Sequence, residues 1–257
     1  MLKKTKLGET DLIITGFSEE GVQIRAVAKG ARRPGSKLGP HLELFSIVRV
    51  LFYQKSQLGI IKEASTVSCN EACRCDVVHS AGAAIIVELL DRVSAEGDKE
   101  ARLFPLLSEA LRCLGEVPGE GVALIAAAAA LKTASQLGYR PSLHECVSCG
   151  SPVGGSEGLS ADMHTRVQDM LYFSFEGGGV VCENCLSEPT RQACTAIGRQ
   201  IIDWASVLIS SRFVDLKAYA DSAHEALGRA LLEFTREWIR FHLVRHLKSL
   251  DFLLSFR

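Results

Sequence analysis

Apolar and polar residues alternate through much of the first 67 residues, which is the pattern of β-strands that bury one face. In residues 21–28, for example, Val22, Ile24 and Ala26 would share one face, while Gln23 and Arg25 would share the other. The pattern predicts strands at residues 11–17, 21–28, 42–53 and 58–67, and a fifth strand fits the first few residues. Such a set suits a small closed or nearly closed β-barrel.

The hydrophobic period changes at Asp76, beyond which apolar residues recur about every four positions, as in amphipathic helices. A helix is predicted over residues 76–93 with Asp76 as its N-cap, and others over 99–114 and 121–137. Two more core-facing helices are predicted nearer the C-terminus. Their apolar stripes are Ala193, Ile197, Ile201, Trp204 and Leu208 in the first, and Leu227, Leu231, Phe234, Trp238 and Phe241 in the second. The chain is therefore expected to have an α+β fold.

A glycine- and proline-rich segment, residues 139–189, interrupts the helical pattern and is too irregular to hold itself together by a core. Because helical spacing resumes after it, we interpret this segment as an insertion into a helical domain. The predicted organisation is a barrel at residues 1–68 and a helical domain at residues 69–257, with the insertion at residues 140–190.

The composition is that of a folded globular protein, with 47% hydrophobic and 23% charged residues in a chain of 257. The longest apolar stretch, residues 122–131, is about half the roughly 20 residues of a membrane-spanning helix. The N-terminal residues lack the apolar segment of a secretory signal, so a cytoplasmic location is expected. Disulfides are not expected there, and metal binding is the first explanation for nine cysteines.

The net charge of −1 conceals an uneven distribution along the chain. Residues 1–62 carry a charge of +6, which leaves −7 for residues 63–257. The densest basic part is a stretch without acids between Gly21 and Leu42, so a polyanionic partner is expected to bind the N-terminal part. A solvated basic loop without a ligand is the alternative interpretation.

Aromatic residues and cations are mixed on the next predicted strand, where Phe45, Phe52 and Tyr53 lie among Arg49 and Lys55. This mixture suits single-stranded nucleic acid, whose bases stack on rings and whose phosphates attract cations. Tyr53 is expected to be exposed because it lies at the strand end, whereas the phenylalanines are more typical of a core. The predicted DNA-binding residues are Arg25, Lys29, Arg32, Arg33, Lys37, Arg49 and Tyr53.

No catalytic constellation emerges from the sequence. The basic loop superficially resembles a phosphate-binding P-loop, but Ser36-Lys37 reverses the required order, and Leu38-Gly39-Pro40 cannot begin the helix that must follow. A G-x-S-x-G motif around Ser156 lacks the strand and helix of a nucleophile elbow. We therefore predict neither ATP hydrolysis nor another enzymatic activity.

Two C-x2-C pairs, Cys146 with Cys149 and Cys182 with Cys185, are separated by 32 residues. Each pair has the spacing at which one turn places two thiolates on a metal ion, and two such turns complete a tetrahedral zinc site. One structural zinc ion is predicted, because four thiolates leave no position open for water or substrate. Four unrelated thiols or a redox pair are the alternatives, although the βαβ context of a redox motif is missing.

A second group, Cys69, Cys73, Cys75 and His79, lies at the predicted junction between barrel and helices. Its spacing matches no metal site that we can justify, so ordinary thiols are the favoured interpretation and a second metal is the alternative.

Several motifs together resemble the RecO family of bacterial DNA repair proteins. They are Gly8-Glu9-Thr10-Asp11, Phe17-Ser18-Glu19-Glu20-Gly21, the stretch AVAKGARRP at residues 26–34, the stretch VELLDR at residues 87–92, and the paired cysteines. The resemblance covers essentially the whole chain. It implies an OB-fold barrel, with Lys29, Arg32 and Arg33 on its basic loop, and a helical domain with an inserted zinc module. The chain starts a few residues inside the family's usual first strand, so that strand is expected to be short.

The same resemblance implies a non-catalytic recombination mediator that works in the cytoplasm at the nucleoid. Such a protein binds single- and double-stranded DNA, anneals complementary strands, and with RecR helps RecA to replace single-strand-binding protein. The basic C-terminal helix, with Arg240 and Arg245, would either hold the acidic tail of single-strand-binding protein or extend the path of the DNA. A zinc-ribbon factor in RNA processing or transcription is one alternative, and a metal- or thiol-dependent enzyme is another.

Overall fold

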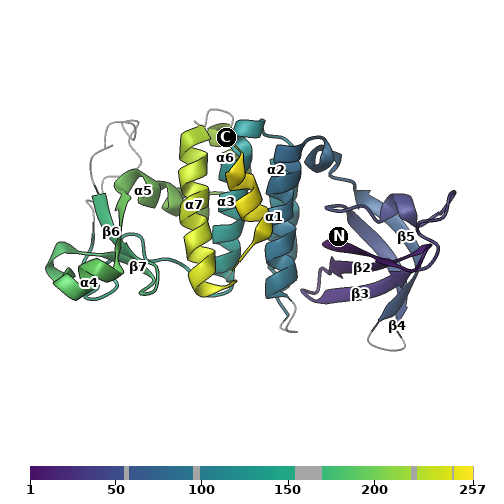
Figure 1. Ribbon diagram of the computed structural model, residues 1–257, viewed down its shortest axis with the longest axis horizontal. Helices are drawn as coiled ribbons and strands as arrows, with labels where there is room; N and C mark the ends of the chain where they lie inside the picture. The colour runs from purple at the N-terminus through teal and green to yellow at the C-terminus, as the bar shows by residue number, and fades with distance from the viewer. Residues whose placement is uncertain (55–57, 95–98, 154–169, 221–224, 245, 257) are drawn as a thin grey trace.

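The computed structural model describes residues 1–54, 58–94, 99–153, 170–220, 225–244 and 246–256. Three parts follow one another along the molecule: a five-stranded sheet at one end, a layer of helices in the middle, and a three-stranded sheet at the other end (Figure 1). This arrangement confirms the predicted α+β class. Of the helices in the described part of the chain, none is long and apolar enough to cross a membrane.

The N-terminal sheet has the strand order β1-β2-β3-β5-β4. Its strands are β1 (Lys3–Leu7), β2 (Asp11–Phe17), β3 (Gln23–Ala28), β4 (Ile47–Gln54) and β5 (Gly59–Ser68), and all neighbours are antiparallel except β3 and β5. The outermost strands, β1 and β4, do not pair with each other in the residues described here, so the sheet is not a closed barrel. The chain start lies near the residues that precede β4, since the Phe45 amide donates to the Met1 carbonyl at 3.1 Å.

Alternation gives this sheet a small core of its own. Inward-facing Leu12, Ile14, Ala26 and Ile61 are all buried and pack together, while their neighbours along the strands face outward. The predicted strand over residues 42–53 begins only at Ile47, because Phe45 has a φ of 67°, which a β-strand cannot accommodate.

The middle layer is built around α3 (Gly119–Gln136), which packs against five other helices. These are α1 (Val77–Val93), α2 (Leu103–Leu114), α5 (Arg199–Ser210), α6 (Phe213–Ala220) and α7 (Glu225–His242), and α8 (Lys248–Ser255) covers α1. The alanine run at residues 126–130 is completely enclosed, because small side chains allow neighbouring helices to approach closely. Among the residues of the last predicted apolar stripe, Phe241 differs: it is 47% exposed at the end of α7, and its ring stacks on Phe175.

The second sheet has the order β7-β6-β8 and lies beyond α7, next to the short helix α4 (Glu188–Ala193) (Figure 1). Its strands are β6 (Met170–Ser174), β7 (Gly179–Val181) and β8 (Thr195–Gly198). The helical stripe predicted from Ala193 to Leu208 is wrong at its start. Ile197 lies in β8, where it pairs with Leu171 of β6, and the helix begins only at Arg199.

Helix α1 connects the N-terminal sheet to the rest of the protein. Asp76 is its N-cap, as predicted, and accepts a hydrogen bond from the His79 amide at 2.9 Å. Farther along, the Asp91 carboxylate and carbonyl accept from the Gln23 amide group of β3 at 3.1 and 3.2 Å. The Glu88 carboxylate accepts from the Ser249 amide and hydroxyl at the start of α8. One helix therefore binds both the sheet and the last helix of the chain.

The turn between β2 and β3 also contacts the helical layer. The Glu100 amide donates to the Gly21 carbonyl at 3.1 Å. Gly21 has a φ of +82°, and a Cβ atom added to it would lie 2.2 Å from the Ala101 nitrogen. Only glycine combines a positive φ with the absence of a Cβ atom, so this position fixes how closely the sheet approaches the residues before α2.

Candidate nucleic-acid interface and metal centre

Strand alternation puts Arg49 and Tyr53 on the outward face of the N-terminal sheet. Arg49 lies opposite Ser65 and Tyr53 opposite Ile60, whereas Phe52, between them, packs on the sheet core. Tyr53 is 54% exposed, as the sequence predicted. An exposed ring and an exposed guanidinium on one strand can stack on a base and bind a phosphate, respectively.

The same outward face continues across three strands. Val27 of β3 pairs with Ile60 of β5, which in turn pairs with Tyr53 of β4. Arg25 is exposed two residues before Val27 and so faces the same side. The alternation continues to the exposed Lys29, at the start of the basic loop.

The basic loop itself lies on the surface after β3, and its four cations Lys29, Arg32, Arg33 and Lys37 are all exposed. Arg32 differs from the other three because its guanidinium donates to the Glu9 and Gly8 carbonyls at 2.9 and 3.3 Å. The Arg32 guanidinium is therefore already hydrogen-bonded to the backbone of the turn between β1 and β2.

Asp11 stabilises the base of this loop by accepting a hydrogen bond from the Gly30 amide at 2.7 Å. That bond, the Thr10 hydroxyl and the nearby charges of Arg33 and Lys29 lower the pKa of Asp11. The carboxylate thus fixes the loop backbone and leaves the Arg33 and Lys29 side chains directed to solvent.

Six of the seven predicted DNA-binding residues are cations, and none of the six has an ion pair in the described part of the chain. Five of them also lack the backbone contacts that hold Arg32, namely Arg25, Lys29, Arg33, Lys37 and Arg49. Unpaired exposed cations attract phosphates more strongly than cations neutralised by a neighbouring carboxylate. The helical layer is different, because Arg112, Arg212 and Lys217 are each paired with acids.

The sequence reasoning missed Leu51, which is 59% exposed between Arg49 and Tyr53. The signal was available in the alternation: residues 49, 51 and 53 must share a face once Phe52 is assigned to the core. An exposed leucine beside an exposed tyrosine extends the apolar surface available to a base.

Of the two arginines predicted to bind a partner, Arg240 is described and Arg245 lies outside the described residues. The Arg240 guanidinium donates to the Glu237 carboxylate at 2.6 and 3.0 Å and lies over the Phe241 ring, 4.7 Å from its centroid. Arg240 also lines a cavity of about 150 Å³ between α7 and α8, together with Ile239 and Leu250. Lys55 and Ser156, singled out in the sequence, also lie outside the described residues.

The four cysteines of the two C-x2-C pairs come together beside the second sheet. Their Sγ atoms all lie within 4.8 Å of one another, and those of Cys149 and Cys182 are 3.7 Å apart. The first turn is closed by the Gly150 amide donating to the Cys146 carbonyl, and the second by the Cys185 amide donating to the Cys182 carbonyl. Four sulfur atoms converge on one point, as a metal-binding cluster requires.

Backbone amides favour the thiolate form at the buried end of this cluster. Burial raises the pKa of the Cys146 thiol, but hydrogen bonds from the amides of Cys182, Ser148 and Cys149 outweigh it and lower the pKa to about 6. Hydrogen bonds to the Cys149 and Cys182 sulfurs raise the pKa of Cys185 to about 12. The cluster thus shares protons among its sulfurs, and a bound cation would replace those protons.

The second group of cysteines forms no metal cluster in the described residues. The Cys73 thiol is buried and donates to the Leu111 carbonyl at 3.3 Å, and burial raises its pKa to about 11. Both ring nitrogens of His79 already have partners, the Asp76 carboxylate at 2.6 Å and the Val117 carbonyl at 3.0 Å. These contacts favour the simpler interpretation of this group as structural residues.

Two family descriptions match nearly all of the chain. Residues 1–70 match "Recombination protein O N terminal" and residues 74–251 match "Recombination protein O C terminal". The first match contains the N-terminal sheet, and the second contains the cysteine cluster.

Several curated relatives carry the name "DNA repair protein RecO". The protein from Desulfitobacterium hafniense is 32% identical over 201 residues, which cover 78% of this chain and 67% of the relative. The one from Cutibacterium acnes is 33% identical over 190 residues, 72% of this chain and 71% of the relative. The Bifidobacterium adolescentis protein is 28% identical over 255 residues, 98% of this chain and 96% of its own length.

Proposed function

The chain belongs to the RecO family of recombination proteins, and on that premise we propose that it is a non-catalytic recombination mediator in DNA repair. It binds single- and double-stranded DNA, anneals complementary strands, and helps to load RecA onto strands coated with single-strand-binding protein. The observation that carries this proposal is the outward face of the N-terminal sheet, where exposed Arg49, Leu51 and Tyr53 alternate along β4 and exposed Arg25 faces the same side from β3.

The N-terminal sheet has the features of an OB-fold, a partly open five-stranded barrel that binds oligonucleotides on its surface and loops. Its five strands, its open seam between β1 and β4, and the basic loop after β3 support this assignment. We assign residues 1–68 to this domain, residues 69–257 to a helical domain, and residues 140–190 to an insertion that carries the cysteines.

The phosphate backbone of the DNA lies along the exposed cations that no other group of the protein holds. Phosphates contact Arg25, Lys29, Arg33, Lys37 and Arg49, and a base stacks on Tyr53. Arg32 contributes chiefly by holding the turn between β1 and β2, because its guanidinium is bonded to the Gly8 and Glu9 carbonyls. Binding of this kind is sensitive to salt and tolerant of sequence.

The metal is a single structural zinc ion bound by Cys146, Cys149, Cys182 and Cys185. A tetrahedral zinc with Zn–S bonds of about 2.3 Å has S···S separations of about 3.8 Å. The 3.7 Å between the Cys149 and Cys182 sulfurs fits that geometry, and the other pairs need only small movements. When bound, zinc joins the two cysteine turns and supplies folding free energy.

Protein partners are RecR and single-strand-binding protein, with RecA acting on the product. The acidic tail of single-strand-binding protein binds at the end of α7, where Arg236 and Arg240 line a small cavity and Arg245 follows in the sequence. The reaction takes place in the cytoplasm at the nucleoid.

A strand-annealing assay on complementary oligonucleotides coated with single-strand-binding protein tests the function. The protein is expected to accelerate annealing without ATP, and the variant Lys29→Ala with Arg33→Ala to lose most of this effect. Arg212→Ala with Lys217→Ala is the matched control, because it removes the same charge from residues already paired with acids. Equal rates with and without the protein would refute the proposal, and a preference for RNA of the same sequence would favour an RNA-binding factor.

A further inference from the structure

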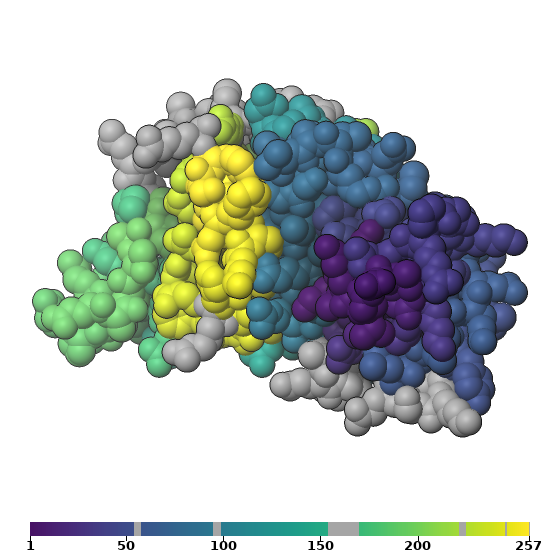
Figure 2. All heavy atoms as spheres, turned by 45° about the vertical axis from the view of Figure 1, so that its right-hand side comes forward, coloured from purple at the N-terminus to yellow at the C-terminus, as the bar shows by residue number. Residues whose placement is uncertain are grey.

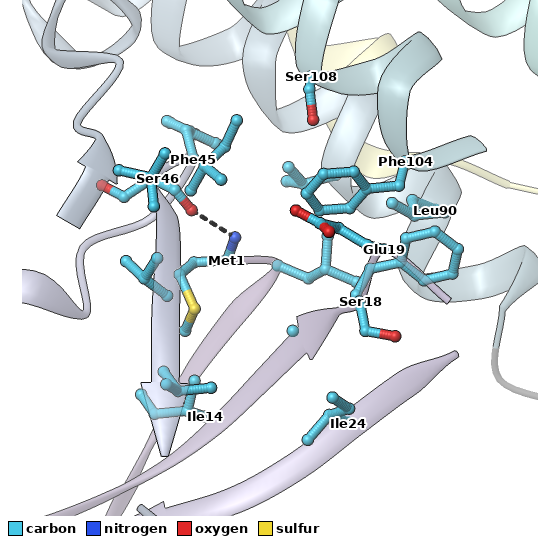
Figure 3. A pocket seen from close by; sticks show the side chains of 18 of the residues that line it. Met1, Ile14, Ser18, Glu19, Ile24, Phe45, Ser46, Leu90, Phe104 and Ser108 are labelled. Carbon is cyan, nitrogen blue, oxygen red and sulfur yellow. Dashed lines mark hydrogen bonds between the residues drawn. The ribbon is translucent and has the colours of Figure 1, made fainter. Parts of the chain in front are cut away.

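A cavity of about 430 Å³ separates the open end of the N-terminal sheet from helices α1 and α2. Ile14 and Ile24 of the sheet line one side, and Leu90 of α1 and Phe104 of α2 line the other (Figure 3). Small-molecule sites have volumes of about 300–1,000 Å³ and occur at domain junctions and in the mouths of β-barrels. The cavity has the size, the walls and the location of such a site.

The buried Met1 amino group, which donates to the Ser46 carbonyl at 2.8 Å, lies on one side of the cavity, and other polar groups lie at the opposite side (Figure 3). The Glu19 carboxylate projects from the β2–β3 turn toward the Phe104 ring, and the Ser108 hydroxyl faces the same space from α2 (Figure 3). Glu20, the next residue, is engaged locally, since a hydrogen bond with Ser18 lowers its pKa. The Glu19 side chain has no hydrogen bond or ion pair within the described parts of the chain.

The turn that carries Glu19 is held firmly in place. The Ser18 amide donates to the Val22 carbonyl at 2.9 Å, and Gly21 closes the turn with a bond of 3.0 Å to the Ser18 carbonyl. The contact between Gly21 and the backbone of Glu100 fixes the turn against the helical layer. The turn therefore holds the exposed Glu19 carboxylate at the edge of the cavity.

Strand β4 belongs to both the cavity and the proposed DNA surface. Val50 and Phe52 line the cavity and pack on the sheet core, whereas the exposed side chains of Arg49 and Tyr53 lie on the outward face of the same strand.

We propose, building on the function above, that the cavity takes up one unstacked base of a bound single strand. The flat apolar faces of a base suit walls of phenylalanine, leucine and isoleucine, as in proteins that extrude a base from the stack. The exocyclic amino groups of cytosine, adenine and guanine donate to a carboxylate, so Glu19 selects bases that carry one. A free phosphate would be repelled by the same carboxylate.

A 2-aminopurine base within a single-stranded run of adenines tests this directly, because its fluorescence is quenched while it is stacked on its neighbours. Binding to the protein is expected to raise the emission roughly two-fold or more, as the base leaves the stack. The anisotropy of a fluorescein label on the same oligonucleotide reports binding itself.

Ser108→Phe fills the cavity from α2 and is expected to abolish the rise in emission with little change in affinity, since phosphate contacts dominate binding. Ser210→Phe adds the same ring at an exposed helix position and should behave as the wild type. Glu19→Gln should lower the preference for cytosine over thymine oligonucleotides, whereas Glu20→Gln, which changes the charge equally, should not.

The two signals distinguish a failure of DNA binding from a failure of base capture. If no anisotropy change occurs, DNA binding and base capture are both refuted. If the oligonucleotide is fully bound but its emission stays quenched, or if Ser108→Phe keeps the full rise, only base capture is refuted and DNA binding stands.

Discussion

The two sheets at the ends of the molecule are stabilised in different ways. The five-stranded sheet encloses a core of its own, around Ile14 and Ile61, that is separate from the helical core. The three-stranded sheet has no such cluster among the described residues; instead Phe173 and Phe175 pack on Phe234 as part of the helical core. The cysteine turns beyond it bury little apolar surface. A sheet with its own core can present a basic surface, whereas the cysteine turns depend on a metal.

Loss of a metal ligand should have the largest effect and should separate the two ends of the molecule. Structural zinc sites contribute about 10–16 kcal/mol of binding free energy, so Cys182→Ser is expected to cost several kcal/mol locally. Hydrogen exchange should rise in the cysteine turns at residues 144–151 and 182–187, while the five-stranded sheet keeps its protection and its DNA affinity. Cys194→Ser is the control, because Cys194 lies outside the cluster.

The metal content of the purified protein checks the same prediction independently. About one zinc per chain is expected in the wild type and in Cys194→Ser, and much less in Cys182→Ser. Wild-type protein prepared without a chelator and found free of zinc would contradict the assignment.

Gly21→Ala should have the next largest effect and tests how the sheet is attached. The added Cβ would meet the Ala101 nitrogen at 2.2 Å in a backbone conformation with a φ of +82°, so a loss of about 3 kcal/mol in unfolding free energy is expected. Gly8→Ala is matched in backbone conformation, with a φ of +60° and open space around it, and should cost only about 1 kcal/mol. Equal losses in urea denaturation would show that the contact with α2 contributes nothing.

The charge of the basic loop should be visible in the salt dependence of binding. Each lost phosphate contact lowers the slope of log affinity against log salt by about 0.7 on single strands, so Lys29→Ala with Arg33→Ala should flatten it by about 1.4. Arg32→Ala should change the slope less, because its guanidinium is bonded to the Gly8 and Glu9 carbonyls. Arg240→Ala, in α7 of the helical layer, should leave the slope nearly unchanged; if it has the larger effect, DNA binds the helical layer and not the five-stranded sheet.

Tyr53→Ala should have the smallest effect of the four changes. Stacking of one base on an aromatic ring contributes about 1–3 kcal/mol, and we expect about 1 kcal/mol for a partly exposed ring. Tyr139, 43% exposed in the helical part, gives a matched control in Tyr139→Ala. Fluorescence titration with single-stranded oligonucleotides measures both, and similar losses would argue against stacking on the sheet.

Features encoded by local spacing could be predicted from the sequence. Strand β2 occupies the predicted residues 11–17, because alternation over seven residues leaves one register that buries Leu12 and Ile14. The cysteine cluster was equally accessible, since two residues between thiols determine the turn and tetrahedral chemistry determines the number of turns.

Features that depend on distant contacts could not be predicted. Ile197 fits a helical stripe, but pairing with Leu171 across the insertion makes it part of a strand. Arg32 and Arg33 are adjacent arginines that the sequence does not distinguish, yet only Arg32 donates to the carbonyls of the turn between β1 and β2. The missing barrel closure is of the same kind, because it depends on where β1 ends relative to β4 in space.

Two carboxylates of helix α1 couple the position of the sheet to that of the last helix. Asp91 is fastened to Gln23 of the sheet and Glu88 to Ser249 of the last helix, and residues three apart lie on adjacent parts of one helix surface. Two anchors less than one turn apart on a stiff rod cannot move independently. A displacement of the sheet at Gln23 is therefore expected to be accompanied by a displacement of the start of α8, which packs on the same helix.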